Sequence, residues 1–194
     1  METLNQALFL FINASSDAHP FVVWTADVFA VYAIWLAPLT LIAGWLRGDM
    51  LLRHYMVEAA MSTGLALLAA QIIGVAWPHP RPFMIGIGTN LMAHSPDSSF
   101  PSDHLTCLWG AAFSLLMHGR TRRIGSALAI LGVPMAWSRI YLGVHFPMDI
   151  VGASMVSGAS AWVLATTGQH PVEFMVGIAS YVYRQVIRTL IRRS

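Results

Sequence analysis

The sequence predicts an all-α membrane protein: a polytopic bundle of five, or alternatively six, transmembrane helices with an interfacial helix at the N-terminus. Of its 194 residues, 56% are hydrophobic and only 10% are charged, and the mean hydropathy is +0.61. A soluble domain of this length would carry more charged surface. The basic residues are all arginines, and they gather between the apolar runs. We therefore expect a single membrane domain over residues 1–194.

The N-terminal residues 1–13 are expected to form a short amphipathic helix on the membrane surface. Leu4, Leu8 and Phe11 recur at helical spacing and would form its apolar face. The segment lacks the basic start of a cleavable signal peptide. We therefore interpret it as part of the folded protein.

Five segments have the hydropathy of spanning helices, which need about 20 apolar residues. The third of them is somewhat short. The proline-rich stretch before it, residues 78–101, is too polar to span. Glu58, near one end of the second span, is expected to snorkel toward the cytoplasm. The predicted spans are residues 21–46, 55–77, 103–118, 124–137 and 147–167.

The last segment, residues 172–194, combines an apolar face with a basic one. Phe174 and Ile178 lie on the apolar face, and Arg184 and Arg188 lie on the other. A spanning helix would have to bury both arginines, which is costly in hydrocarbon. We therefore expect a basic amphipathic helix on the membrane surface, with a sixth span as the alternative.

The arginines also predict the orientation of the bundle. Arg47 and Arg53 lie between the first two spans, a second group occupies residues 120–123, and a third lies in the tail. With five spans all three groups fall on one side, which the positive-inside rule assigns to the cytoplasm. The N-terminus and the loops 78–101 and 138–147 then fall outside.

The outer loop 138–149 carries a histidine, an aspartate and an arginine at a spacing suited to phosphate chemistry. Pro147 is typical of the first turn of a helix. Asp149 would then lie in that turn and could reach back to His145, fixing its tautomer and leaving the other ring nitrogen free to attack. Arg139 supplies a planar fork for phosphate oxygens. The alternative is a structural His–Asp cap beside a snorkelling arginine.

Two further outer-face runs carry groups that could bind an anion. Ser102 is a good N-cap residue for the third span, and free backbone N–H groups at a helix start bind anions. His104 would face the same anion and could protonate a leaving oxygen. Arg81 follows the second span. Each could instead be an ordinary cap or an interfacial residue. Together they suggest a cage for a five-coordinate phosphoryl transition state.

These runs resemble the three motifs of the type-2 phosphatidic acid phosphatase superfamily, which also includes vanadium haloperoxidases. The third motif is matched in full by Ser138, Arg139, His145 and Asp149. The resemblance covers roughly residues 50–165. It implies a membrane helix bundle that hydrolyses a phosphate ester or anhydride without a metal or another cofactor.

The other two motifs are matched with departures. The second is present as residues 101–104, with Asp103 where the family usually has glycine. The first keeps Arg81 and Pro82, but Gly74 stands where the family lysine would fall. We expect Asp103 to point away from the phosphate, with an arginine as a candidate partner.

The resemblance assigns a role to each matched residue. It implies that a phosphohistidine forms on the nucleophile, that an aspartate orients that nucleophile, and that a second histidine is the general acid. The remaining matched residues would hold the phosphate. The implied catalytic residues are His145, Asp149 and His104, and the implied substrate-binding residues are Arg81, Ser102 and Arg139.

Within the superfamily, the chain looks most like bacterial undecaprenyl-diphosphate phosphatases of the bacitracin-resistance type. This implies hydrolysis of undecaprenyl diphosphate at the periplasmic face of the bacterial inner membrane, with membrane lipids and no nucleic acid as partners. His79 could replace the missing lysine, and Asn90 or His94 could contact a second phosphate. The alternatives are a phosphatase or phosphotransferase acting on phosphatidylglycerophosphate, phosphatidic acid or lipid A, and, less favoured, a non-enzymatic membrane protein.

Overall fold

The polypeptide forms helices almost throughout, and the predicted all-α class is confirmed. The structure is a computed structural model that describes residues 2–191, and the side chains of residues 2–189. Within that range there are eight α-helices and two short 3-10 helices. They are α1 (Glu2–Ile12), α2 (Pro20–Tyr32), η1 (Ala33–Trp35), α3 (Leu36–Arg47), α4 (Met50–Ala76), η2 (Pro82–Ile85), α5 (Asp103–Leu116), α6 (Arg122–Tyr141), α7 (Pro147–Thr167) and α8 (Gln169–Ile191).

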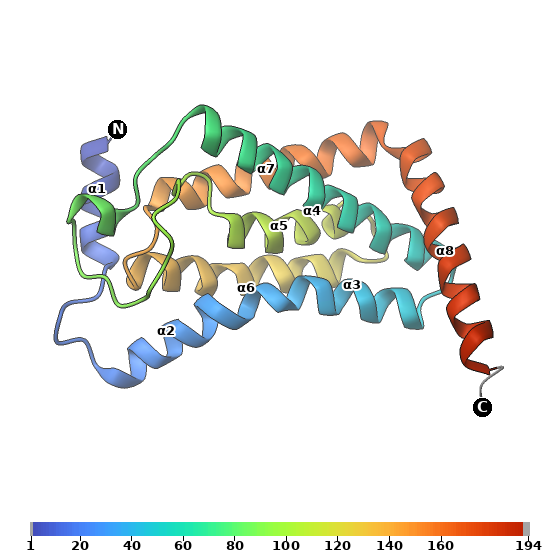
Figure 1. Ribbon diagram of the computed structural model, residues 1–194, viewed down its shortest axis with the longest axis horizontal. Helices are drawn as coiled ribbons and strands as arrows, with labels where there is room; N and C mark the ends of the chain where they lie inside the picture. Colours follow the sequence, from blue (N-terminus) through green and yellow to red (C-terminus); the bar gives the residue numbers. More distant parts are fainter. Residues whose placement is uncertain (1, 192–194) are drawn as a thin grey trace.

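The helices form an elongated bundle that is closed at each end by a helix lying across it. Figure 1 shows α2 and α3 in line with each other beside α4, α5, α6 and α7, with α1 across one end and α8 across the other. Four segments of the described chain are long and apolar enough to cross a membrane: residues 20–47, 50–76, 122–141 and 147–167. The protein is therefore a multi-pass membrane protein.

The first predicted span is not one continuous helix. It consists of α2 and α3, joined by the single 3-10 turn η1. Pro38 explains the break, because proline has no N–H to donate to the carbonyl of Ile34 and its ring would clash with that carbonyl. The backbone therefore tightens over Ala33–Trp35, just where the α-helical bond would be lost.

The third predicted span is α5, which has only 14 residues and lies at the centre of the bundle. It packs against α4, α6 and α7. A Cβ on Gly110 would come within 2.9 Å of the Thr63 backbone in α4, and one on Gly132 of α6 would meet the Trp109 ring. Small residues thus allow close helix contact. Because other helices surround α5, it can be shorter than a lipid-facing span.

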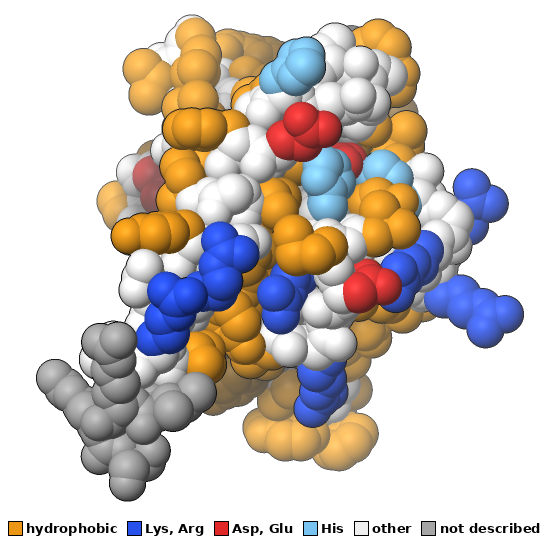
Figure 2. Space-filling model, turned by 90° about the vertical axis from the view of Figure 1, so that its right-hand side faces the viewer, with side chains coloured by type: hydrophobic (Ala, Val, Ile, Leu, Met, Phe, Trp, Pro, Cys, Tyr) orange, Lys and Arg blue, Asp and Glu red, His pale blue; other side chains and the backbone are white. Residues whose placement is uncertain are grey.

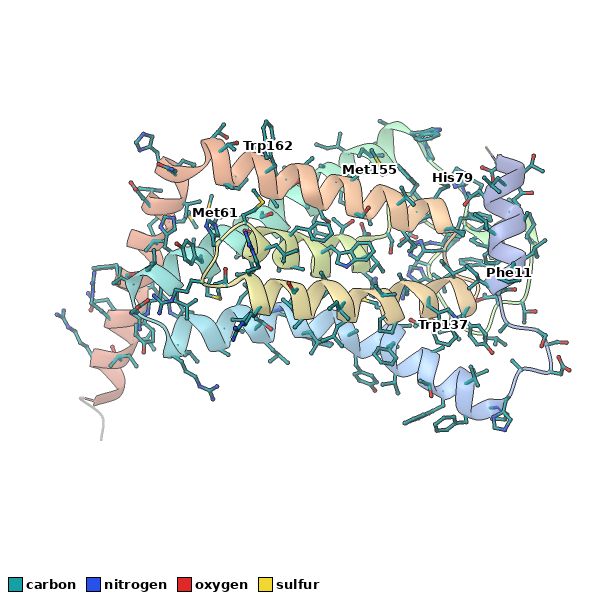
Figure 3. All side chains as sticks on the ribbon, turned by 180° about the vertical axis from the view of Figure 1, so that it is seen from behind. Phe11, Met61, His79, Trp137, Met155 and Trp162 are labelled. Carbon is teal, nitrogen blue, oxygen red and sulfur yellow. The ribbon has the colours of Figure 1, made fainter. Side chains whose placement is uncertain are left out.

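The N-terminal segment forms the expected helix, α1, and turns its apolar stripe away from the bundle. Leu4, Leu8 and Phe11 are exposed, whereas Asn5 and Phe9 are the buried residues of the helix. Figure 3 shows Phe11 on α1 at the end of the bundle. The apolar stripe found in the sequence therefore points away from the protein, as a helix in contact with lipid requires.

At the opposite end, α8 packs against the bundle from its first turn as far as Tyr183, whose ring contacts Trp45 and Arg53. Val172 and Val176 are buried and pack against α4, whereas Arg184 and Arg188 are exposed. Figure 2 shows arginine side chains gathered over this end. No part of α8 is among the four segments apolar enough to span. The end of the expected tail, residues 192–194, lies outside the described residues.

Glu58 does not snorkel, and that expectation was wrong. Its side chain is only 6% exposed and accepts a hydrogen bond from Nε2 of His118 at 2.8 Å. The His118 ring stacks on Tyr55 with 4.1 Å between centroids. His118 lies in the turn after α5, so it reaches a carboxylate that would otherwise be buried without a partner.

Candidate active site

The loops that precede α5 and α7 meet the N-termini of these helices at the α1 end of the bundle. α7 begins at Pro147, as predicted. The backbone N–H of Ser102 donates to the carbonyl of Asp149 at 3.2 Å, which joins the two helix starts. Gly143 has a positive φ of 87°, and a Cβ there would meet the carbonyl of Thr89. Glycine therefore permits the turn that brings the two loops together.

His145 and Asp149 form a buried pair, each 1% exposed. The contact predicted between them is present, because Nδ1 of His145 lies 3.1 Å from Oδ2 of Asp149. The same oxygen accepts the backbone N–H of Phe146 at 2.8 Å. Nε2 of His145 faces the guanidinium of Arg81 at 3.1 Å and the hydroxyl of Ser102 at 3.3 Å.

These contacts fix the tautomer of His145. A guanidinium group can only donate, so Nε2 must accept from Arg81 and carries no proton. Nδ1 therefore carries the proton and donates it to Asp149. Burial holds the pKa of His145 well below its usual value, and the charges of Arg139 and Arg81 lower it further. The imidazole is thus neutral at neutral pH, with its Nε2 lone pair directed into the site.

Arg81 is almost completely buried and is already paired. Its Nε and Nη2 donate to Oδ1 of Asp97 at 2.8 and 2.7 Å. Its Nη1 and Nη2 also donate to the carbonyls of Val144 and Ser98, at 3.3 and 3.2 Å. The guanidinium plane is therefore held rigidly beside His145.

Arg139 is equally buried but has no carboxylate partner. Its Nη2 lies 2.9 Å from Nε2 of His94, its Nη1 lies 3.8 Å from the sulfur of Met92, and its Nε makes no hydrogen bond. None of the ion pairs in the described part of the chain includes Arg139. A buried cation without a counter-charge is costly, so the site is suited to receive an anion.

The rings of His94 and His104 lie beside Arg139 and His145, and together with Arg81 these side chains form what we call the phosphate cage. The ring centroid of His94 lies 6.4 Å from that of His104 and 6.4 Å from that of His145. Burial lowers the pKa of His94, and the charge of Arg81 adds to the effect. His94 is therefore neutral and accepts the hydrogen bond from Arg139.

Ser102 occupies the N-cap position of α5, but its hydroxyl does not cap the helix. It points at Nε2 of His145 instead, so Ser102 is the predicted N-cap residue by position while its hydroxyl faces the site. Asp103 does point to a neighbouring helix, but its partner is Gln71, whose amide donates to both carboxylate oxygens at 3.1 Å. The expectation of an arginine partner for Asp103 was also wrong.

The structure does not bring His79 or Asn90 into the cage. Nδ1 of His79 lies 3.2 Å from the hydroxyl of Ser99, and its Nε2 lies 3.6 Å from Glu2. The side chain of Asn90 accepts the backbone N–H of Met92 and so stabilises a turn. At Gly74, where the family lysine would fall, an added Cβ would make only ordinary contact with Ser98 and Phe100.

Two asparagines near the N-terminus hold the site loops, and the sequence analysis missed both. Asn13 donates to the carbonyls of Thr89 and Tyr141 at 2.9 and 3.0 Å and accepts the N–H of Thr89 at 2.7 Å. Asn5 accepts the N–H of Met148, in the first turn of α7, at 3.0 Å. The sequence offers one sign of this role: Asn5 lies four positions before Phe9, so the two side chains share a face of α1 away from its apolar stripe.

The fold and the site define a class of membrane protein. One end of a helix bundle brings together a neutral histidine, its carboxylate partner, two buried arginines and two helix N-termini. The sequence matches the PAP2 superfamily over residues 55–171. The chain belongs to this superfamily and is an enzyme of its lipid phosphatase class.

Several known proteins are similar to the chain over most of its length. It is 38% identical to YbjG of Escherichia coli (strain K12), a candidate undecaprenyl-diphosphatase, over 84% of each chain. It is 36% identical to undecaprenyl-diphosphatase BcrC of Bacillus subtilis (strain 168), over 79% of each chain.

Solved structures show the same fold. LpxE of Aquifex aeolicus superposes with a TM-score of 0.66 at 24% identity, covering 82% of this chain and 93% of the other. A PAP2-type phosphatidylglycerolphosphate phosphatase of Bacillus subtilis superposes with a TM-score of 0.63 at 16% identity, covering 87% of this chain and 86% of the other.

Proposed function

We propose that the protein hydrolyses undecaprenyl diphosphate to undecaprenyl phosphate and inorganic phosphate. The observation that carries the proposal is the unprotonated Nε2 of His145, which faces Arg81 and Ser102 while Nδ1 is held by Asp149. The substrate comes from similarity, because BcrC, named an undecaprenyl-diphosphatase, is 36% identical over 79% of the chain.

In the first step, Nε2 of His145 attacks the terminal phosphorus and forms a phosphohistidine. The bond from that phosphorus to the bridging oxygen breaks, and its electron pair goes to the leaving undecaprenyl phosphate. His104 donates a proton to this oxygen. Arg81 and Arg139 stabilise the charge on the equatorial oxygens, and Asp149 stabilises the positive charge on the ring.

In the second step, water attacks the phosphohistidine. His104, now neutral, accepts a proton from the water as the new oxygen–phosphorus bond forms. The bond between phosphorus and Nε2 breaks, and its electron pair returns to His145. Inorganic phosphate leaves, and both histidines regain their starting protonation states.

The contacts of the two buried arginines suggest how the diphosphate is bound. Arg139 contacts His94, and Arg81 contacts Asp97. Phosphate oxygens would replace these two contacts. We retain His94 as a contact for the second phosphate. His79 and Asn90 are not retained as substrate contacts, because their side chains face Ser99 and Met92.

For the membrane orientation, we propose five spans with α5 as the third and with α8 on the cytoplasmic surface. The exposed arginines of α8 and those of the α3–α4 and α5–α6 connections lie at one end (Figure 2), and the site lies at the other. The positive-inside rule then puts the arginine end in the cytoplasm. The site would face the periplasm from the bacterial inner membrane.

Phosphate release from purified protein tests the proposed substrate. The panel is undecaprenyl diphosphate, phosphatidylglycerophosphate, phosphatidic acid and a lipid A phosphate, each in the same detergent. We expect the highest kcat/KM with undecaprenyl diphosphate, and inhibition by vanadate, which mimics the five-coordinate transition state. A clear preference for any other lipid would overturn the substrate assignment but not the histidine mechanism.

A further inference from the structure

We propose that a cavity at the arginine-rich end of the bundle binds the primary ammonium head group of a phospholipid. The cavity lies at the opposite end from the phosphate cage, among residues that the phosphatase mechanism does not use. The inference therefore goes beyond the proposed function, and its test does not depend on the substrate. It also gives a role to Glu58, whose burial the sequence did not predict.

The cavity lies where the starts of α4 and α8 meet the end of α7 and the turn after α5. Its volume is about 530 Å³. Because α4 and α7 are two of the segments long enough to cross a membrane, a cavity at their ends lies at the level of lipid head groups. The polar side chains of its lining are those of His54, Tyr55, Glu58, His118, Gln169 and Glu173.

Glu58 brings a carboxylate oxygen without a hydrogen bond to the wall of this cavity. Its side chain is only 6% exposed, and its Oε1 accepts from Nε2 of His118 at 2.8 Å. Its Oε2 makes no hydrogen bond within the described part of the chain, and its contact with Nε2 of His54 is long, at 4.0 Å. A buried carboxylate oxygen without a donor is costly. The cavity is the side from which a donor can reach it.

The lining carries two negative charges and no arginine. Glu58 and Glu173 supply the carboxylates, and the two histidines can offset this charge but cannot reverse it. Figure 2 shows acidic and histidine side chains gathered in one part of this end, beside the arginines. Such a lining favours a cation. Among the described residues no group of His, Cys, Asp or Glu side chains is arranged to hold a metal ion, so the ligand class is an organic cation.

A primary ammonium group matches the acceptors of the lining. It has three N–H donors and no acceptor, like the ammonium of lysine. Glu58, Glu173 and Gln169 supply oxygen acceptors in the lining. A trimethylammonium group has the same charge but no N–H donor, so it would leave these oxygens without partners. The difference between the two groups defines the test.

The rim of the cavity favours a lipid as the source of the ammonium group. Met50 and Leu51 line the cavity and are exposed, so the apolar part of a lipid can lie against them. Asp49, the residue before Met50, accepts from Nη1 of Arg120 at 2.9 Å. Arg120 is 46% exposed and can also donate to a phosphate group. The ammonium and phosphate of phosphatidylethanolamine therefore fit a negative cavity with a positive rim.

Lipid binding measured by native mass spectrometry tests the proposal. The purified protein in detergent is titrated with phosphatidylethanolamine and with phosphatidylcholine of the same acyl chains. We expect phosphatidylethanolamine to bind at least about fivefold more tightly, because only this lipid offers N–H donors to the two carboxylates. Equal affinity for the two lipids would overturn the inference.

Two variants locate the binding site. Glu58→Gln and Glu173→Gln each remove a charge and keep the size of the side chain. We expect Glu58→Gln to weaken binding of phosphatidylethanolamine about fivefold or more, and Glu173→Gln, at an exposed position, about two- to threefold. Asp17→Asn, at an exposed carboxylate in the α1–α2 loop, is the matched control and should change nothing. Wild-type affinity in Glu58→Gln would contradict the proposal, and if that variant fails to fold, Glu173→Gln decides alone.

Thermal unfolding distinguishes a lipid from a free amine. Phosphatidylethanolamine should raise the melting temperature of the wild type but not that of Glu58→Gln, because a ligand stabilises only a protein that binds it. Ethanolamine at the same concentration should have no effect. An equal rise with ethanolamine would assign the cavity to a free amine and would overturn the lipid as its ligand.

Discussion

The two buried arginines differ in what they contact before substrate arrives. Arg81 is paired with Asp97, whereas Arg139 has only His94 and a methionine sulfur beside it. A phosphate group gains a fully available cation at Arg139 but must displace a carboxylate at Arg81. Because Asp97 itself is 59% exposed, this competition is partly screened by water.

Replacing Asp97 tests this competition. Asp97→Asn keeps the size of the side chain but removes its charge, so we expect KM to fall by about two- to fivefold, which corresponds to less than about 1 kcal/mol. The turnover number should change little. Steady-state kinetics at low salt measure the effect, and Asp17→Asn, at an exposed carboxylate in the α1–α2 loop, is the matched control. A higher KM in Asp97→Asn would show instead that Asp97 serves to hold Arg81 in place.

The lowered pKa of His145 predicts the acid side of the pH profile. Attack requires a neutral imidazole, and a lowered pKa keeps that form present to lower pH. The acid limb of kcat/KM should therefore lie below the usual histidine value of about 6.5. His104→Ala should keep the acid limb in place but lower the rate at every pH, because the leaving oxygen then lacks its proton donor. An acid limb above pH 7 would contradict the assignment.

Among the helices, α1 is the one whose role could not be read from the sequence. Its exposed leucines are typical of a surface helix, but its buried Asn5 and the half-buried Asn13 that follows it hold the loops around the site. Side chain-to-backbone hydrogen bonds over more than 70 residues of sequence have no local pattern that would predict them.

The elements that were predicted well are those set by local chemistry. Pro147 fixes the start of α7, and hydropathy fixes its extent to Thr167. The contact between His145 and Asp149 follows from a spacing of four residues across that helix start. The partners of Asp103 and Glu58 depend on neighbouring helices, so the sequence pattern could not supply them.

Replacing Asn13 tests whether α1 holds the site. Asn13→Asp removes the amide donor that reaches Thr89 and Tyr141, so the two loops should separate and kcat should fall by about tenfold. Gln6→Ala is the matched control, because Gln6 lies on α1, which Asn13 directly follows, and its side chain bonds to Glu2 at the surface. Equal activity of the two variants would mean that α1 serves only as a membrane anchor.

At the scale of the whole molecule, the phosphate cage and the arginine-rich surface lie at opposite ends of the bundle. Small residues between the helices bring their backbones close. The polar side chains buried between them, such as Ser62 and Ser157, are uncharged and donate to backbone carbonyls. The buried charges are thus confined to the two ends, where water or a phosphate group can reach them. This separation links the direction of insertion to the side on which hydrolysis takes place.

Reporter fusions test that direction. A reporter that is active only in the cytoplasm should be active when fused to the C-terminus. A reporter that is active only in the periplasm should be active when inserted in the loop between α1 and α2. A C-terminal reporter active in the periplasm would show that α8 spans the membrane and would restore the six-span alternative.

The central claim is that Nε2 of His145 attacks phosphorus. Its most direct test is the rate of phosphate release from undecaprenyl diphosphate by His145→Ala, measured on protein whose melting temperature matches that of the wild type. Nε2 of His94, which is also unprotonated, is already bonded to Arg139 and is therefore a poor substitute for Nε2 of His145. We predict a loss of about 1,000-fold or more in kcat, whereas turnover within tenfold of the wild type would contradict the mechanism.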